Sequence, residues 1–451
     1  MSSNHELKEV SQTQMSHTTD IKKSSIVDPE SSQQPTGSSG MSATIFNIVN
    51  SAVGAGTVAI PLRMKQCGLV LGTLLTIFAA ISTGAALHFL GRVGSISKAK
   101  KYSDLGFYTY GRKGEMITVA AFLLLIMAPL IAYHKIVGNY LNADLSNVES
   151  LPSLLTSSEF TSLVIAMGVI LPLSLLKNIG HLAKASLVCL VFILYAVILV
   201  VYQCVANISK IDFSKLVLFD LKLSILSDLS VMVMAFVSHT TIIDIFNDMK
   251  VPTVKNKLFA VSISNFIATI LYLIVGIFGY LSMDVYLKDK TPFATADNVL
   301  TWNPEIAFLV GRIAFAFMIA MTYPLFLFPT RQLADWIIRE TCSSNTKFIK
   351  SYNSKPDLVR IIMTFVFIFF PYAISCIPGL SLDFVFSIFG FTAGSLLVYI
   401  LPSLFFMKIK QQIKPTFGEK MLAYMNLGVG FILLVVGTTY YLINAFNSPQ
   451  V

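Results

Sequence analysis

Polar side chains and two glycines interrupt the middle of an apolar run at residues 41–68, in the stretch NSAVGAG at 50–56. Glycine weakens a helix, and backbone groups without partners are costly in hydrocarbon. A run long enough to enter a bilayer therefore keeps such an interruption only where it is buried in protein or lines a cavity. Free carbonyl and amide groups at a broken membrane helix can hold a small zwitterion and a coupling ion. The stretch predicts a site of that kind.

A second apolar run, at 229–248, becomes polar halfway along, in the four residues SHTT at 238–241. Consecutive polar residues at membrane depth are expensive unless they face water or partners. We therefore predict a second interruption there, facing the first. The alternative is an unbroken helix in which Ser238 and Thr240 form hydrogen bonds to their own backbone.

The composition predicts a membrane protein. Of 451 residues, 55% are hydrophobic and 13% are charged, whereas soluble domains carry about 25% charged residues. The net charge of +9 does not indicate a nucleic-acid partner, because lysine and arginine are spread over the short loops between apolar runs. The five cysteines form no CxxC pair, so neither a disulfide framework nor a zinc site is expected.

Apolar runs near the bilayer-spanning length of about 20 residues recur eleven times. They lie at about 43–63, 69–91, 117–141, 160–177, 183–206, 229–248, 259–281, 305–328, 358–377, 383–406 and 422–446. The polar residues 1–40 are predicted to form a disordered tail. We expect an all-α polytopic membrane protein with eleven transmembrane helices, built as a five-plus-five inverted-repeat core (about 41–206 and 228–406) plus one extra helix (about 422–446).

The loop charges predict an orientation. Basic residues are concentrated in the tail and in the even-numbered connections, which places the N-terminus and these loops in the cytoplasm. With eleven spans, the C-terminus then lies in an organelle lumen or outside the cell. The expected membrane is that of a vacuole or lysosome-like organelle, or the plasma membrane.

Two segments carry a family resemblance. Residues 46–56, followed by Pro61 and Gly68, resemble the opening helix of the amino acid/auxin permease family, which includes the system A/N neutral amino acid transporters and fungal vacuolar amino acid transporters. Residues 321–331 (MTYPLFLFPTR) are similar to that family's eighth helix, and the His239 region to its sixth. The resemblance extends from about residue 41 to the end. It implies secondary active transport of amino acids by alternating access, coupled to H⁺ or Na⁺, without a cofactor.

The resemblance also implies roles for matching residues. In sodium-coupled members, an asparagine and backbone carbonyls of helix 1 hold the ion together with a threonine of helix 8, and these positions correspond to Asn50 and Thr322. Both would be metal ligands only if the chain is coupled to Na⁺. Half-helix ends have dipoles that complement the charged groups of an amino acid. The residues expected to bind the substrate are Ser51, Ala52, Val53, Gly54, Ala55, Gly56, Phe236, Val237, Ser238 and His239.

The sequence departs from the family pattern at Asp244, where many members have proline. Asp244 and Asp248 lie four residues apart, on one helix face, and repel each other unless one is protonated or paired. This indicates Asp244 as a proton-accepting, ion-coupling residue. The alternative is a pair of solvated carboxylates at the membrane edge.

Other function classes stay open or are disfavoured. No Walker, HExxH or GxSxG sequence is present, so an ion or substrate gradient is expected to drive the protein, and we predict no enzyme activity. A channel would need continuous polar faces on several helices, whereas the sequence shows interruptions. A transporter-like amino acid sensor would signal through residues 1–40, and deleting this tail would spare the flux of a transporter. The expected partners are an amino acid, H⁺ or Na⁺, and membrane lipid.

Overall fold

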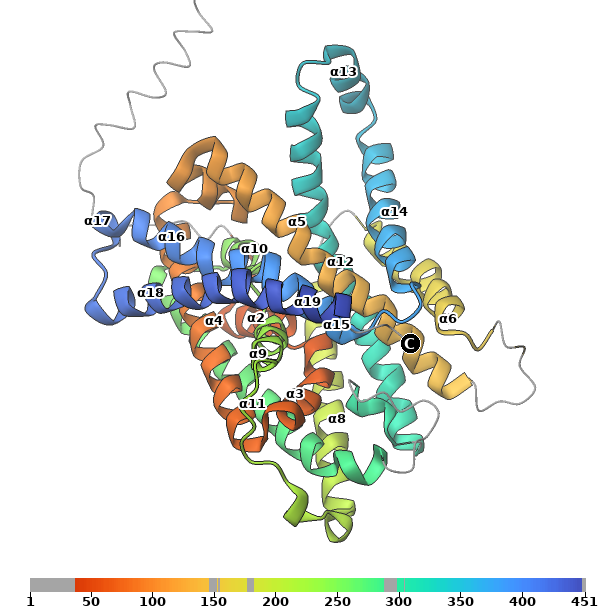
Figure 1. The fold of residues 1–451 in the computed structure, drawn as a ribbon. Coiled ribbons are helices and arrows are strands. Elements are labelled where there is room, and N and C mark those ends of the chain that lie inside the picture. The colour runs from red at the N-terminus through yellow and green to blue at the C-terminus, as the bar shows by residue number, and fades with distance from the viewer. Residues whose placement is uncertain are drawn as a thin grey trace, which may run out of the picture.

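The computed structural model describes residues 37–145, 152, 155–176, 182–287, 298–303 and 305–447. Helices make up the secondary structure of these residues, apart from an isolated β-bridge between Ser39 and Met249. The helices pack into one bundle around an apolar core (Figure 1). The predicted all-α fold is confirmed. Most of the predicted tail, residues 1–36, lies outside the described residues.

Helices coincide with all of the predicted spans. The first five are α2 (Met41–Ala52) with η2 (Ala55–Ala59) and α3 (Ile60–Cys67), α4 (Leu69–Ser97), α5 (Tyr102–Leu145), α6 (Ser158–Ile165) with η3 (Ala166–Ile170) and α7 (Leu171–Ser174), and α8 (Leu182–Ala206). The others are α9 (Ile225–Ala235) with α10 (Ile242–Asn247), α11 (Val254–Leu287), α12 (Ile306–Thr341), α14 (Pro356–Ser375), α15 (Leu382–Phe389) with η8 (Gly390–Ile400) and α16 (Leu401–Lys408), and α18 (Phe417–Ile432) with η9 (Leu433–Gly437) and α19 (Thr438–Asn447).

Fewer helices are long and apolar enough to cross a membrane than the eleven predicted spans. By length and composition, eight helices in the described ranges can cross a membrane, or nine if the bent pair α2 and α3 forms one span. The segments Ser158–Ser174 and Ile225–Ala235 are shorter apolar helices, and they correspond to the fourth and sixth predicted spans. The count of eleven transmembrane helices stays a prediction.

The first and sixth spans are both interrupted. The chain bends by 51° between Met41–Ala52 and Gly56–Cys67. In the sixth span, α9 ends at Ala235 and α10 begins at Ile242, so residues 236–241 are not α-helical. The alternative of an unbroken helix over 229–248 is therefore wrong.

The two interruptions meet at Gly56. A β-carbon on this residue would lie 2.7 Å from both Cα and Cβ of Ala235, closer than real β-carbons come to other atoms. Helix α11 packs along both α2 and α3, and glycines again permit close approach, because a β-carbon at Gly279 would lie 2.5 Å from Cγ of Pro61. Small residues at membrane helix contacts let backbones come together. The glycines therefore set the spacing of the broken helices.

The long connections lie at opposite ends of the bundle. Helices α12 and α14 extend together beyond their neighbours and are joined through α13 (Thr346–Ser354), whereas the connection from α8 to α9 lies at the other end (Figure 1). This arrangement agrees with the predicted placement of the two connections on opposite membrane sides. Which side is cytoplasmic stays a prediction from the loop charges.

We predict that Gly56→Ala destabilises the protein by about 1–3 kcal/mol, because the new methyl group must push η2 away from α9. The matched control is Gly428→Ala in α18, where a β-carbon would meet nothing within 4 Å. The control should be neutral or slightly stabilising, since alanine favours helix over glycine. Thermal unfolding of the purified variants measures both. Equal midpoints would contradict the close approach of the two interruptions.

Candidate functional site

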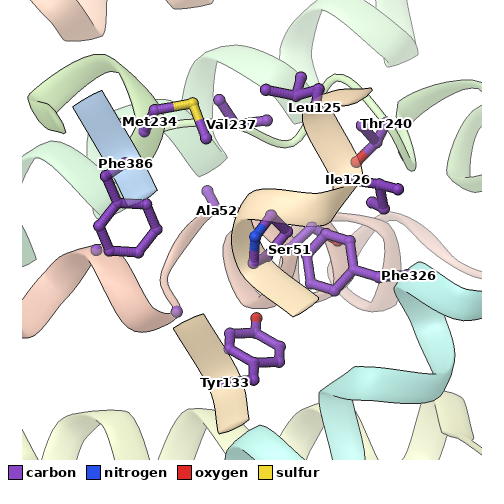
Figure 2. A pocket seen from close by; sticks show the side chains of 13 residues that line it. Ser51, Ala52, Leu125, Ile126, Tyr133, Met234, Val237, Thr240, Phe326 and Phe386 are labelled. Atoms are coloured by element: carbon purple, nitrogen blue, oxygen red, sulfur yellow. The ribbon is translucent and has the colours of Figure 1, made fainter. Parts of the chain in front are cut away.

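A cavity of about 40 Å³ lies between the two interruptions (Figure 2). This volume is enough for only a few water-sized groups. The cavity is lined by α2, η2, α5, α9, α12 and α15 and by the residues that follow α9. Its lining residues are Ser51, Ala52, Gly54, Gly56, Leu125, Ile126, Pro129, Tyr133, Met234, Val237, Thr240, Phe326 and Phe386.

The cavity has polar groups at the interruptions and apolar walls elsewhere. In Figure 2 the Tyr133 hydroxyl points toward Ser51, and a β-carbon at Gly54 would lie 3.1 Å from that hydroxyl oxygen. The Thr240 hydroxyl is buried, and no described residue forms a hydrogen bond with it. Aromatic and aliphatic side chains from α5, α9, α12 and α15 supply the walls, and none of the described residues that line the cavity carries a charge. Such a site can receive a small polar group together with a neutral side chain.

Half of the residues predicted to bind substrate line this cavity. These are Ser51, Ala52, Gly54, Gly56 and Val237. Val53, Phe236, Ser238 and His239 are buried in the same two interruptions without lining it, and the side chain of Ala55 is outside the described part of the chain. Within the part of the chain that the structure describes, the Ser238 hydroxyl and both ring nitrogens of His239 have no hydrogen-bond partner. Substrate binding by these ten residues stays a prediction.

Apart from Val237 and the residues of the first interruption, the lining residues were not among the predicted substrate-binding residues. The largest group comes from α5, where Leu125, Ile126, Pro129 and Tyr133 line the cavity. Leu125, Pro129 and Tyr133 are spaced by four residues and Ile126 follows Leu125, so all four lie on one helix face, a signal that the sequence does contain. Nothing in the sequence indicated that this face, rather than another, would meet the interruptions.

Asn50 and Thr322, the predicted ion ligands, are both buried. The Asn50 side-chain oxygen finds no hydrogen-bond partner among the residues that the structure describes. The Thr322 hydroxyl donates to the Met318 carbonyl oxygen at 2.8 Å, and its oxygen lies 4.0 Å from the Cys189 sulfur. Helix α8 packs against both α2 and α12, which carry these residues. Uncharged oxygens of this kind suit a hard cation.

Asp244 and Asp248 have different surroundings. Asp248 accepts hydrogen bonds from the Ser38 hydroxyl at 3.1 Å and from the Ser39 hydroxyl at 2.5 Å. The backbone N–H of Ser39 donates to the Asp248 carbonyl oxygen, and that of Lys250 donates to the Ser39 carbonyl oxygen. The structure therefore pairs one of the two carboxylates. Asp244 is partly buried in α10 and does not line the cavity, and its coupling role stays a prediction.

A buried ionic network joins three helices around the interruptions. The Arg63 guanidinium of α3 lies 2.8 Å from a carboxylate oxygen of Asp383 in α15 and 3.5 Å from one of Asp228 in α9. The Arg63 and Asp228 side chains are at most 2% exposed, whereas that of Asp383 is 33% exposed. Beside the network, the hydroxyls of Ser227 and Ser387 are 2.7 Å apart and also join α9 to α15. These contacts fasten α3 and α9, the second half of one broken span and the first half of the other.

The model of the family described as "Transmembrane amino acid transporter protein" matches residues 37–443. The chain belongs to this family. The predicted family resemblance is thereby confirmed, and the many apolar helices make the chain a multi-pass membrane protein.

Curated relatives carry transporter names. Solute carrier family 38 member 10 of Homo sapiens is 26% identical over 411 residues, which cover 90% of this chain and 35% of the relative. The chain thus spans about a third of the length of that relative. Putative sodium-coupled neutral amino acid transporter 11 of Danio rerio is 28% identical over 408 residues, covering 89% of this chain and 86% of the relative.

Two solved structures share the fold. A Na⁺-coupled sialic acid symporter in a substrate-bound, outward-open state superimposes with a TM-score of 0.57 at 11% identity, covering 90% of each chain. Mhp1, a nucleobase-cation-symport-1 family transporter in a closed conformation with bromovinylhydantoin bound, gives a TM-score of 0.58 at 13% identity, covering 95% of this chain and 98% of Mhp1. The chain therefore has the LeuT-like fold that was predicted.

We predict that Arg63→Gln destabilises the protein by about 3–5 kcal/mol, because it leaves the carboxylates of Asp228 and Asp383 close together without a counter-charge. Adding Asp228→Asn should restore part of the loss. Lys65→Gln is the matched control on the same helix, since Lys65 pairs with Asp284 at a half-exposed position and should change stability by less than about 1 kcal/mol. Thermal unfolding in detergent measures all three. A double variant no more stable than Arg63→Gln would contradict this account of the network.

Proposed function

We propose that the protein is a secondary transporter that moves neutral amino acids across a membrane by alternating access. The observation that carries this proposal is the cavity between two broken helices in a chain of the amino acid transporter family. N–H groups at the start of a helical segment and C=O groups at the end of one lack partners within the helix. The segment from Gly54 to Gly56 would receive the carboxylate, and Ser51 with carbonyls near Val237 would receive the ammonium group.

The lining chemistry supports a neutral side chain. Leu125, Phe326 and Phe386 are apolar, and the cavity offers no charged partner to a basic or acidic substrate. Placing an unpaired charge in such surroundings costs several kcal/mol. The relatives named as putative neutral amino acid transporters are consistent with this choice.

The oxygen ligands at the predicted ion site favour sodium as the coupling ion. The Asn50 side-chain oxygen, without a hydrogen-bond partner among the described residues, and the Thr322 hydroxyl oxygen are neutral oxygen ligands, which suit a hard cation and which do not bind protons at neutral pH. Proton coupling through Asp244 is the second candidate. The partial burial of that carboxylate in α10 favours it, and separate gradients decide between the two ions.

Alternating access requires closure at both ends of the cavity. The Arg63 network fastens α3, α9 and α15 at one end of the broken helices. At the other end, residues Ser38 and Ser39 are bound to Asp248, directly after α10. A cavity of only about 40 Å³ fits a state in which both ends are closed. Opening would then break one set of contacts while the other remains.

The first test is uptake of radiolabelled amino acids by proteoliposomes, with sodium and pH gradients imposed independently. We expect uptake of small neutral amino acids driven by the sodium gradient. Uptake of lysine and glutamate should be at least about 100-fold lower, because neither finds a partner in the cavity. Absence of uptake and of exchange under every gradient would overturn the proposed function.

The sensor alternative is tested with the same vesicles. Nothing in the family match or in the related structures points to a sensor. Because Ser38 and Ser39 are bound to Asp248, the informative truncation removes residues 1–36 and keeps these contacts. A transporter keeps its flux after this truncation. Amino acid binding without flux in both the full and the truncated chain would favour a sensor.

The ion site is tested by Asn50→Ala and Thr322→Ala. Each variant removes one oxygen ligand, so we expect sodium-driven uptake to fall at least about ten-fold and the sodium concentration at half-maximal uptake to rise. Thr269→Ala is the matched control, since the Thr269 hydroxyl also bonds to the carbonyl oxygen four residues earlier, at 2.7 Å. Unchanged proton-driven uptake in both variants would move the coupling site to Asp244 or His239.

A further inference from the structure

The hydroxyl of Tyr272 lies between the ends of the two interrupted helices. Its oxygen is 2.8 Å from the carbonyl oxygen of Ala52 and 2.6 Å from that of Ala235. Ala52 is the last residue of α2, and Ala235 is the last residue of α9. Tyr272 itself belongs to α11 and is fully buried. One side chain from a third helix thus joins both ends.

Two helix ends that point at one place need a partner there. The last carbonyl groups of a helix receive no hydrogen bond from an N–H group within the helix, and they carry a partial negative charge. The carbonyl groups of two helix ends therefore repel each other when the ends converge. A cation coordinated by both carbonyls or a hydrogen-bond donor can stabilise them. A tyrosine hydroxyl shares one proton between the two acceptors and adds no charge. Unlike a bound cation, it is part of the chain and cannot leave the site.

The hydroxyl is held firmly in this position. The Tyr272 ring packs edge-on against Phe236, with ring centroids 4.7 Å apart and planes at 86°. The contact of Gly56 with Ala235 closes the junction further. A cation between the same two carbonyls would have to occupy the place of the hydroxyl oxygen.

We propose that Tyr272 is a positioning residue whose hydroxyl takes the place of a coordinated cation between α2 and α9. It keeps the two helix ends at one spacing whatever salt surrounds the protein. No transported ion then binds between the ends of α2 and α9. The coupling ion binds and leaves at Asn50 and Thr322 instead. This last consequence rests on the function proposed above, whereas the contact itself does not.

The first experiment replaces Tyr272 by phenylalanine, 4-fluorophenylalanine and 4-aminophenylalanine in the full chain and compares thermal unfolding midpoints. The amino group has two N–H donors for two carbonyls, so its midpoint should equal or exceed that of tyrosine. Phenylalanine should lower the midpoint and weaken binding of a neutral amino acid about ten-fold. The fluoro variant should be the least stable, because its negative fluorine faces two carbonyl oxygens.

A merely space-filling role gives a different order. The fluoro and amino variants would then both match tyrosine, and phenylalanine would be the least stable, which would overturn the proposal. An amino variant no more stable than phenylalanine would overturn it as well. The same replacements at the exposed Tyr424 of α18 are the control and should leave the midpoint unchanged. If phenylalanine at 272 prevents folding while the amino variant folds, the proposal is supported.

The second experiment tests whether the hydroxyl replaces a cation. In an Asn50→Ala background, Tyr272→Ala leaves the two carbonyls facing open space. The unfolding midpoint of this double variant should rise with NaCl but not with choline chloride at equal ionic strength. The midpoint of Asn50→Ala alone should respond equally to both salts. Equal responses in the double variant would overturn the replacement of a cation. Because unfolding is measured without flux, failure of the proposed transport function would leave these results decisive.

Discussion

The need of backbone carbonyls for partners is the constraint on which this structure depends. A helix that stops inside an apolar bundle exposes its last carbonyls where water cannot reach them. Here two helices stop at Ala52 and Ala235, and the Tyr272 hydroxyl lies within hydrogen-bond distance of both ends. Helix α11 must therefore run beside both breaks. It packs along α2 and α3 at the first break, and its Tyr272 hydroxyl lies 2.6 Å from the Ala235 carbonyl oxygen at the second. Because the Tyr272 hydroxyl bonds to both helix ends, the two breaks are stabilised and the cavity between them persists.

The position of the first break could be predicted from the sequence, although the physical reason differs in part. Glycine in the stretch 50–56 was expected to weaken the helix. In the structure, Gly56 is also required by contact, since a β-carbon there would overlap the backbone of Ala235. The second break has no glycine, and its polar run at 238–241 indicated its place only through the cost of polar groups in lipid. Both breaks were thus predictable from local composition.

Residues that act through tertiary packing could not be predicted in the same way. Tyr272 sits in an apolar run with nothing local to distinguish it from other membrane tyrosines, and its role arises only when α2 and α9 end on either side of it. The cavity residues Phe326 and Phe386 likewise depend on how α12 and α15 lie against the breaks. Hydropathy specifies that such helices are buried but does not specify which faces meet.

The two ends of the broken helices are closed by different interactions. On the α3 and α9 side, Arg63 is shared by two carboxylates, and separating a buried charge from its partners is costly unless water replaces them. On the α10 side, Asp248 is held by serine hydroxyls and backbone groups, which are uncharged. Ser38 is exposed, so water can replace its hydrogen bond at little cost, whereas Ser39 is buried. Under the alternating access proposed above, the α10 side should therefore open more readily, because its contacts are hydrogen bonds of neutral groups to one carboxylate and not a buried ionic network. Opening on the other side requires water to reach Arg63 first, and Asp383, with a third of its side chain already exposed, offers the path.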